Sequence, residues 1–146
     1  MILQQKKAIR IVTKSKFNSH TVPLFKYHDI LPLDREAKCS KILFMYHDYI
    51  HGRLPKSFDG LWNRNNERVE NDRELRNANH FHIPFIRLSS FMSFPIAEFP
   101  RIWNDTVISN NIDENVRRKS FSKIVKNFLL NTLEFVCNRV NCQECL

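Results

Sequence analysis

The stretch that decides the fold is Leu33–Gly52, which reads LDREAKCSKILFMYHDYIHG. Asp34 stands where a helix cap is expected, and Glu36 lies where a carboxylate stabilises the positive end of a helix. Gly52 is the residue type that most often follows the last turn of a helix. Between them lie the apolar residues Ala37, Leu43, Phe44, Met45, Tyr46 and Tyr49. We therefore predict a helix with a wide apolar face, which needs other helices packed against it.

Two further segments have helical periodicity and supply those partners. In residues 2–13, Ile2, Ile9 and Val12 recur at helical spacing, with Lys and Arg between them. In residues 120–136 the apolar positions follow the i, i+3, i+4, i+7 pattern; they are Phe121, Ile124, Val125, Phe128, Leu129 and Leu133. We expect the helix after Pro32 to pack between these two, at the centre of a small helical bundle.

Shorter elements are expected between the long helices. Thr21 is placed to cap a short helix that carries Pro23 in its first turn. Pro95 and Pro100 bracket a helical patch that ends near Trp103, which we expect to anchor the core. The polar residues 59–79 predict an exposed, mobile loop.

A short β-hairpin is expected in the middle of the chain, over residues 81–94. Two β-prone stretches occur there, Phe81–Ile86 and Leu88–Phe94, although Pro84 cannot donate a ladder hydrogen bond. With only two Gly and six Pro in the chain, a fold built from many hairpins is disfavoured. The predicted class is therefore mainly α.

Composition and length predict one folded domain. The chain has 146 residues, of which 42% are apolar and 12% aromatic, and this is too much core material for a disordered protein. We place a helical domain at 1–136 and a Cys-rich tail at 137–146. No signal-peptide core and no apolar run of roughly 20 residues is evident. We expect an intracellular protein, cytoplasmic or nuclear, with no membrane partner.

The net charge of +8 indicates a polyanionic partner, RNA or DNA before a membrane. The basic first helix and the basic entrance of the last helix are predicted to line one groove that neutralises phosphates. Its candidate residues are Lys6, Lys7, Arg10, Lys14, Arg117, Arg118, Lys119 and Lys123. Trp62, Phe81 and Phe85 are candidates for stacking bases. The alternative is that the Lys and Arg residues only cover the exposed faces of amphipathic helices, while the aromatic residues fill the core.

Catalysis by the chain alone is not expected, and we assign no catalytic residue. Two glycines cannot build a Gly-rich phosphate loop, and the acidic residues are single and interspersed with bases, so paired metal-binding aspartates are not evident. His47 and His51 are spaced as in a zinc-protease helix with Asp48 in place of the glutamate base. The shorter carboxylate and the absence of a third patterned ligand favour a solvated or hydrogen-bonded histidine pair.

Cys137, Cys142 and Cys145 supply three soft ligands within reach of one zinc ion. A fourth ligand would come from Cys39, His80 or His82. Reduced thiols on a frayed tail are the alternative, because two regular Cys-x2-Cys halves are absent. Metal analysis of the purified protein distinguishes the two, since a zinc staple requires stoichiometric zinc.

The order of several short phrases resembles the region that follows the polymerase in reverse transcriptases of LINE-type (non-LTR) retrotransposons such as the jockey group. Leu3-Gln4-Gln5-Lys6-Lys7-Ala8-Ile9-Arg10-Ile11 resembles the family's opening L-Q-K-K/R-A-I-R-I, and His20-Thr21-Val22-Pro23-Leu24-Phe25 resembles H-T-x-P-L-F. Leu54-Pro55-Lys56-Ser57-Phe58 resembles L-P-x-S-F, and Pro100-Arg101-Ile102-Trp103-Asn104 resembles G-P-x-L-W-N. Residues 120–130 are similar to the closing S-F-K-x-x-L-K-x-x-L-L helix.

The resemblance implies that the intact polypeptide is an RNA-directed DNA polymerase encoded by a transposable element. The catalytic aspartate pair of the family's palm and its upstream endonuclease are not found in this chain, so the piece would hold nucleic acid or support the polymerase. Phe99 stands where the family has Gly, and Asp105-Thr106 stands where it has Leu-Pro. Such drift is typical of a decayed copy.

A second hypothesis is a small basic helical module that binds an RNA or protein partner, with the Cys-rich tail as a zinc staple. Genomic context discriminates between the two hypotheses. A retroelement remnant lies downstream of polymerase sequence and occurs in many diverged copies, whereas a single intact locus favours the module.

Overall fold

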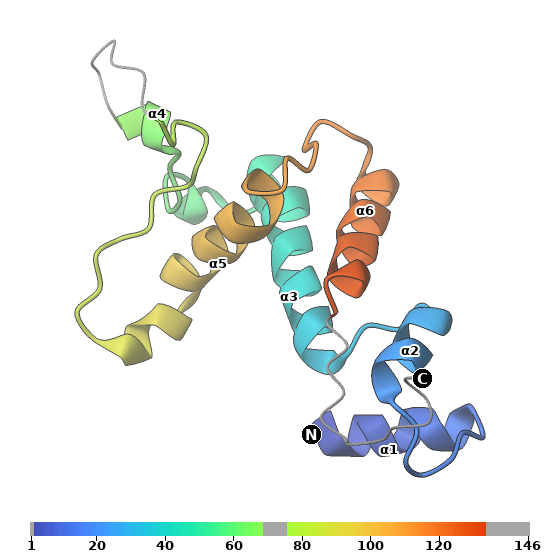
Figure 1. Ribbon diagram of the computed structural model, residues 1–146. Helices are drawn as coiled ribbons and strands as arrows, with labels where there is room; N and C mark the ends of the chain where they lie inside the picture. Colours follow the sequence, from blue (N-terminus) through green and yellow to red (C-terminus); the bar gives the residue numbers. More distant parts are fainter. Residues whose placement is uncertain (1, 69–75, 134–146) are drawn as a thin grey trace. The chain divides into compact units, whose positions relative to one another are not determined.

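The computed structural model (Figure 1) describes residues 2–68 and 76–133 and is mainly helical. The helices expected from the sequence are present as α1 (Ile2–Val12), α2 (Thr21–Tyr27), α3 (Leu33–Phe44), α5 (Pro95–Trp103) and α6 (Arg118–Asn131). The described residues also form a short helix, α4 (Asn65–Arg68), and two 3-10 turns, η2 (Lys56–Phe58) and η3 (Ser89–Ser93). The prediction of a mainly α fold is confirmed.

Two of the helices widen into π-helical turns. α3 continues as η1 (Met45–Ile50), and α5 continues as η4 (Asn104–Ile108). In η1 the hydroxyls of Tyr46 and Tyr49 donate hydrogen bonds to the carbonyls of Val116 and Trp62. Single π-turns of this kind are uncommon and redirect side chains relative to a regular helix.

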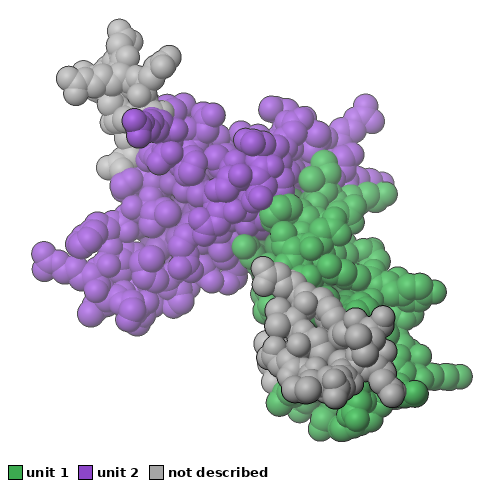
Figure 2. Space-filling model, in the orientation of Figure 1, with its two compact units in different colours: residues 1–39, 123–146 green, residues 40–122 purple. Residues whose placement is uncertain are grey.

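The chain divides into two compact units (Figure 2). The first unit comprises residues 1–39 and 123–146, and the second comprises residues 40–122. The predicted Cys-rich tail 137–146 lies outside the described residues. Among residues 2–68 and 76–133, no helix combines the length and apolarity that crossing a bilayer requires.

In the first unit, α1 packs on α2 and also holds the start of α3. Ile9, Phe25 and Leu31 are buried. The Gln5 side chain accepts a hydrogen bond from the Leu33 backbone N–H at 2.9 Å and donates one to the Leu31 carbonyl at 3.3 Å. Gln5 therefore satisfies the free Leu33 amide, and Asp34 lies within the first turn of α3 instead of at the predicted cap position. Likewise α2 begins at Thr21 itself, and no side-chain cap hydrogen bond is formed there.

The second unit is built around aromatic rings. Phe121 stacks on Tyr46 with ring centroids 3.9 Å apart and on Trp103 with centroids 5.9 Å apart. Trp62 stacks on Phe99 at 5.8 Å. Because Trp103 and Phe121 are both completely buried, the expectation that Trp103 anchors the core is confirmed.

The predicted β-hairpin over residues 81–94 is wrong. The described residues contain no strand, and their one isolated bridge joins Arg64 to Phe81. The hydrogen-bonding groups of Phe81 are taken by the side chain of Asn104, and the N–H of His82 donates to the Asn63 carbonyl at 2.9 Å. The second half of the segment forms η3 instead.

Four helices end in the same backbone motif, although the chain has only two glycines. Lys14, Asp29, Gly52 and Asn111 each adopt a positive φ, between 50° and 63°. After α1, the Lys14 N–H donates to the Ile11 carbonyl and the Ser15 N–H donates to the Arg10 carbonyl. This pair of bonds is typical of a helix C-terminus at which the next residue adopts the left-handed conformation. Gly52 takes this role after η1, as its sequence position predicted.

Candidate nucleic-acid interface

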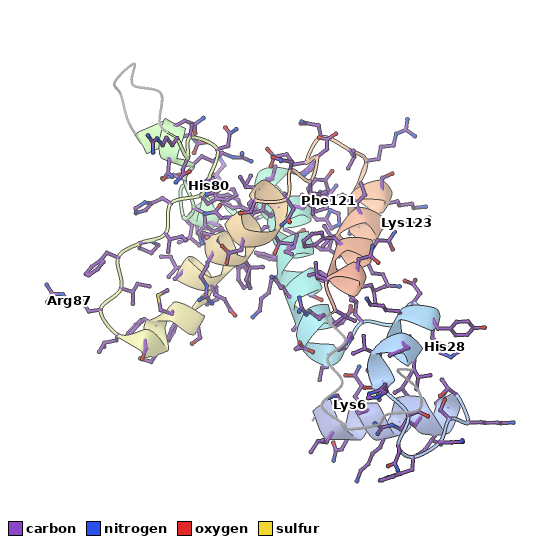
Figure 3. The ribbon with its side chains drawn as sticks, viewed as in Figure 1. Lys6, His28, His80, Arg87, Phe121 and Lys123 are labelled. Carbon is purple, nitrogen blue, oxygen red and sulfur yellow. The ribbon has the colours of Figure 1, made fainter. Side chains whose placement is uncertain are left out.

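The most basic part of the chain is α1 with the loop that follows it. The first 28 residues contain no Asp or Glu. They contain six Lys and Arg residues, namely Lys6, Lys7, Arg10, Lys14, Lys16 and Lys26. Lys7 and Lys14 are exposed, whereas Lys6 and Arg10 are half-buried. Figure 3 shows Lys6 on α1. With no acid in this stretch of sequence, its local field attracts anions.

An open groove of about 360 Å³ lies between the end of α1 and the following loop. Lys7, Arg10 and Lys14 supply its cationic lining. Ile11, Ser15 and Phe17 supply the remainder. The groove therefore combines positive charge with apolar surface, which is the combination that binds the phosphates and bases of a nucleic acid.

The loop over the groove is tied to α1 by its own hydrogen bonds. The Arg10 side chain donates from Nε to the Ser19 carbonyl at 2.8 Å. The Thr13 hydroxyl donates to the Ile9 carbonyl at 2.8 Å and lies 2.8 Å from the Ser15 hydroxyl. These bonds fix residues 13–19 against the helix end, so the position of Phe17 beside the cations is built into the backbone.

The exposed apolar side chains of the groove were missed by sequence reasoning. Phe17 is 77% exposed and Ile11 is 76% exposed. Phe17 stands between Lys16 and Asn18, in a polar stretch without helical periodicity. An aromatic residue isolated among polar and basic residues was the available signal, because a core aromatic normally belongs to a periodic apolar pattern.

Two of the three aromatic residues expected to stack bases are core residues instead. Trp62 and Phe81 are each only 3% exposed. The Trp62 indole N–H donates to the Ile96 carbonyl at 3.2 Å, and the Arg64 guanidinium lies 5.1 Å from the centroid of the Phe81 ring. Both rings therefore leave almost no exposed surface on which a base could stack, and the alternative of core filling holds for them. Phe85 is 89% exposed.

The basic entrance of α6 is exposed as predicted. Arg117, Arg118 and Lys119 are exposed residues of the second unit, and Lys123, labelled in Figure 3, is an exposed residue of the first. Lys126 forms an ion pair with Asp29 at 2.5 Å. Positive side chains at a helix N-terminus oppose the helix dipole, so an anion there relieves repulsion. That these residues share one groove with α1 stays a prediction.

The histidine pair does not form a metal site with a third ligand among the described residues. No group of three or more His, Cys, Asp or Glu residues able to hold a metal occurs within 2–68 and 76–133. His51 Nδ1 lies 2.6 Å from the Tyr46 carbonyl, which is the hydrogen-bonded alternative. His47 is buried, and desolvation together with the charge of Arg118 lowers its pKa.

The candidate zinc ligands Cys137, Cys142 and Cys145 lie outside the described residues. Cys39, a candidate fourth ligand, is a buried free thiol. Burial and the nearby Glu36 carboxylate raise the pKa of Cys39 to about 11.

A second hollow, of about 440 Å³, lies in the second unit. Its walls are almost entirely apolar and include Phe44, Phe58, Leu61, Trp62 and Phe99. Beside it, the Lys41 ammonium and the Glu98 carboxylate form an ion pair at 2.7 Å. Its chemistry suits a bulky apolar group and gives no role to the basic residues considered above.

Comparisons with known proteins identify no neighbour. The chain matches no family model, no curated protein and no solved structure. The likeness to LINE-type reverse transcriptases therefore rests on the quoted phrases and on their order along the chain.

Proposed function

We propose that this chain binds nucleic acid through the groove at the end of α1, and that it is the post-polymerase part of a LINE-type reverse transcriptase. The observation that carries the binding proposal is the convergence of Lys7, Arg10 and Lys14 on one groove, in a stretch of 28 residues without an acid. Neutralising phosphates with such a cluster releases counterions and drives association.

The positions of the family-like phrases support the second half of the proposal. The H-T-x-P-L-F phrase overlaps α2, and the L-P-x-S-F phrase contains η2. The Trp-Asn pair of the fourth phrase provides two buried residues, Trp103 and Asn104. These residues have structural roles, as expected of a region that holds nucleic acid or supports a polymerase without carrying its chemistry.

Under this proposal the chain has no catalytic activity of its own. Joining nucleotides requires carboxylates that hold metal ions, and the proposal places these in the polymerase palm of the parent polypeptide. The chain's contribution is then affinity for the template or product strand. Primer extension by the isolated chain, on a template with nucleotides and magnesium, would contradict it.

Fluorescence anisotropy with a labelled oligonucleotide tests the binding proposal. Changing Lys7 and Lys14 together to Gln removes two groove cations and is expected to weaken binding. On a single strand, the slope of log affinity against log salt should become shallower by about 1.4, because each phosphate contact contributes roughly 0.7. The matched control changes Lys56 and Arg101, two exposed bases of the second unit, to Gln.

The control removes the same net charge. It therefore distinguishes binding at the α1 groove from general attraction of nucleic acid by the positive charge of the whole chain. If both double variants lose affinity equally, no α1 site exists. If the unmodified chain shows no salt-dependent binding to single-stranded or duplex DNA or RNA, the proposed nucleic-acid binding is wrong.

The apolar hollow of the second unit favours a second candidate function, support of the polymerase by direct contact. Its occupant would be a bulky apolar side chain of the remaining polypeptide, since the lining includes Phe44, Leu61 and Phe99. If flanking DNA encodes a polymerase, its product should co-purify with this chain. Leu61→Glu should abolish co-purification, whereas Leu88→Glu, at a position 60% exposed and not on the hollow, should not.

Flanking DNA also tests the family assignment. Polymerase sequence upstream, in frame or frameshifted, together with many diverged copies, is the expected result. A single intact locus with no polymerase sequence nearby would favour the small interaction module instead.

A further inference from the structure

We propose that the α1 groove accepts an unpaired nucleic-acid strand, with one base stacked on Phe17 and the adjacent phosphates held by Lys7 and Lys14. The inference rests on the proposed nucleic-acid binding and adds the class of ligand. It follows from the juxtaposition of an exposed ring with cations inside one groove.

The chemistry of the groove has two parts that match the two parts of a nucleotide. Phe17 and Ile11 present apolar surface to solvent, since their side chains are 77% and 76% exposed. Lys7, Arg10 and Lys14 present positive charge around the same space. Aromatic faces stack on any base, and ammonium and guanidinium groups bind phosphate. A simple anion would use the cations alone and would leave the exposed Phe17 without a role.

The size of the groove also fits one nucleotide. Its volume of about 360 Å³ lies near the lower end of the roughly 300–1,000 Å³ that small-molecule sites span. The groove is open, so the strand can continue into solvent on both sides of the bound nucleotide. A groove of this size takes one base with its phosphate and not the width of a double helix.

Base pairing decides which nucleic acid can use the ring. In a duplex, each base face is covered by the neighbouring base pairs, so Phe17 can reach a base only if the stack opens. That opening costs a few kcal/mol. Phosphate contacts by the lysines remain possible with either form. The stacking contribution should therefore be confined to unpaired strands.

The backbone segment that carries Phe17 is held in place before a base binds, so little backbone order is lost on binding. Arg10 holds the Ser19 carbonyl, and Thr13 and Ser15 hold the turn at Lys14. Residues 13–19 thus need no rearrangement to present Phe17. Pre-organisation of this kind raises affinity because the ordering cost has been met in folding.

The test compares one labelled oligonucleotide, as DNA and as RNA, in its unpaired form and annealed to its complement. Phe17→Ala is expected to weaken binding of the unpaired strand by between about fivefold and 150-fold, the range for losing one stacked base. Duplex affinity and the salt slope should stay unchanged, since no cation is removed. Phe17→Trp should retain the affinity for the unpaired strand.

Tyr27→Ala is the matched control, because Tyr27 is 85% exposed and does not line the groove. It should leave every affinity unchanged. Circular dichroism checks that Phe17→Ala keeps its helices, and Phe17→Trp provides a variant that retains a ring.

The outcomes separate this inference from the proposed function. Binding that Phe17→Ala leaves unchanged, or that it weakens equally for unpaired strand and duplex, overturns the stacking inference while the phosphate contacts survive. No binding to any of the probes overturns the proposed function as well. Preference for the unpaired strand, lost in Phe17→Ala and kept in Phe17→Trp, establishes both.

Discussion

The buried side chain of Asn104 and the backbone of Phe81 exchange two hydrogen bonds. The Phe81 N–H donates to Asn104 Oδ1 at 2.9 Å, and Asn104 Nδ2 donates to the Phe81 carbonyl at 2.8 Å. The amide thereby satisfies both backbone groups of a residue that a neighbouring strand would otherwise pair. This relationship fixes the loop before η3 to the end of α5, within the second unit.

Replacing Asn104 by Ala is expected to lower the free energy of unfolding by roughly 2–6 kcal/mol, because two buried backbone groups lose their partners at about 1–3 kcal/mol each. Urea denaturation measures the effect. Asn127→Ala, at an exposed position on α6, should change stability by no more than about 0.5 kcal/mol. Equal effects of the two variants would refute the assigned role of Asn104.

Phe121→Ala should be among the most destabilising single substitutions in the second unit. The Phe121 ring is completely buried and is stacked between Tyr46 and Trp103, so truncation leaves a cavity and removes both contacts. The expected loss is about 3–5 kcal/mol in thermal or urea unfolding. Phe85→Ala removes the same atoms from an exposed site and should cost less than about 0.5 kcal/mol.

Gly52→Ala should destabilise the chain through its backbone alone. Gly52 has a φ of 63°, and a Cβ added there meets no atom within 4 Å, so side-chain collision plays no part. The expected cost is about 1–2 kcal/mol, the penalty for an L-residue in the left-handed region. Gly52→Asn should cost less than Gly52→Ala, because Asn adopts this conformation readily. The reverse order in urea denaturation would contradict the backbone explanation.

His47 predicts a loss of stability in mild acid. Burial is the main cause that lowers its pKa in the folded chain, and the charge of Arg118 acts in the same direction. The unfolded chain therefore binds the proton more readily, so this contribution to stability is full above the ordinary histidine pKa of about 6.5. It is lost as the pH falls from there toward the folded pKa. Urea unfolding at a series of pH values measures it.

His47→Gln removes the titrating group. The free energy of unfolding of this variant should therefore vary less than that of the unmodified chain between about pH 7 and pH 5, a range that spans the ordinary histidine pKa. His28→Gln, at an exposed position, is the control and should keep the pH dependence of the unmodified chain. The same acid response in both variants would exclude His47 as its source.

Cys39 should resist alkylation until the chain unfolds. Its thiol is buried, and burial raises its pKa to about 11, so both access and thiolate are scarce at neutral pH. Mass spectrometry of iodoacetamide-treated protein should find Cys39 modified at least about tenfold more slowly in the folded chain than in urea. Equal rates in the two conditions would contradict its burial.

The helices could be predicted because their signals are local. The periodicity of residues 2–13 becomes α1, and Gly52 ends the long helix as its position indicated. The basic face of α1 could be found in the same way, since Lys7 and Arg10 are three residues apart on the predicted helix. Residues three or four apart on a helix share a face whatever the remainder of the fold does.

Contacts between distant residues required the tertiary structure. Trp62 and Phe17 are both aromatic residues in polar surroundings, yet Trp62 is buried against Phe99 and Phe17 is exposed beside α1. The hairpin failed for the same reason, because the partner of Phe81 is Asn104 and not a neighbouring strand. Local sequence determines which helices form and which of their faces are charged. Burial and hydrogen-bond partners depend on which segments the folded chain brings together.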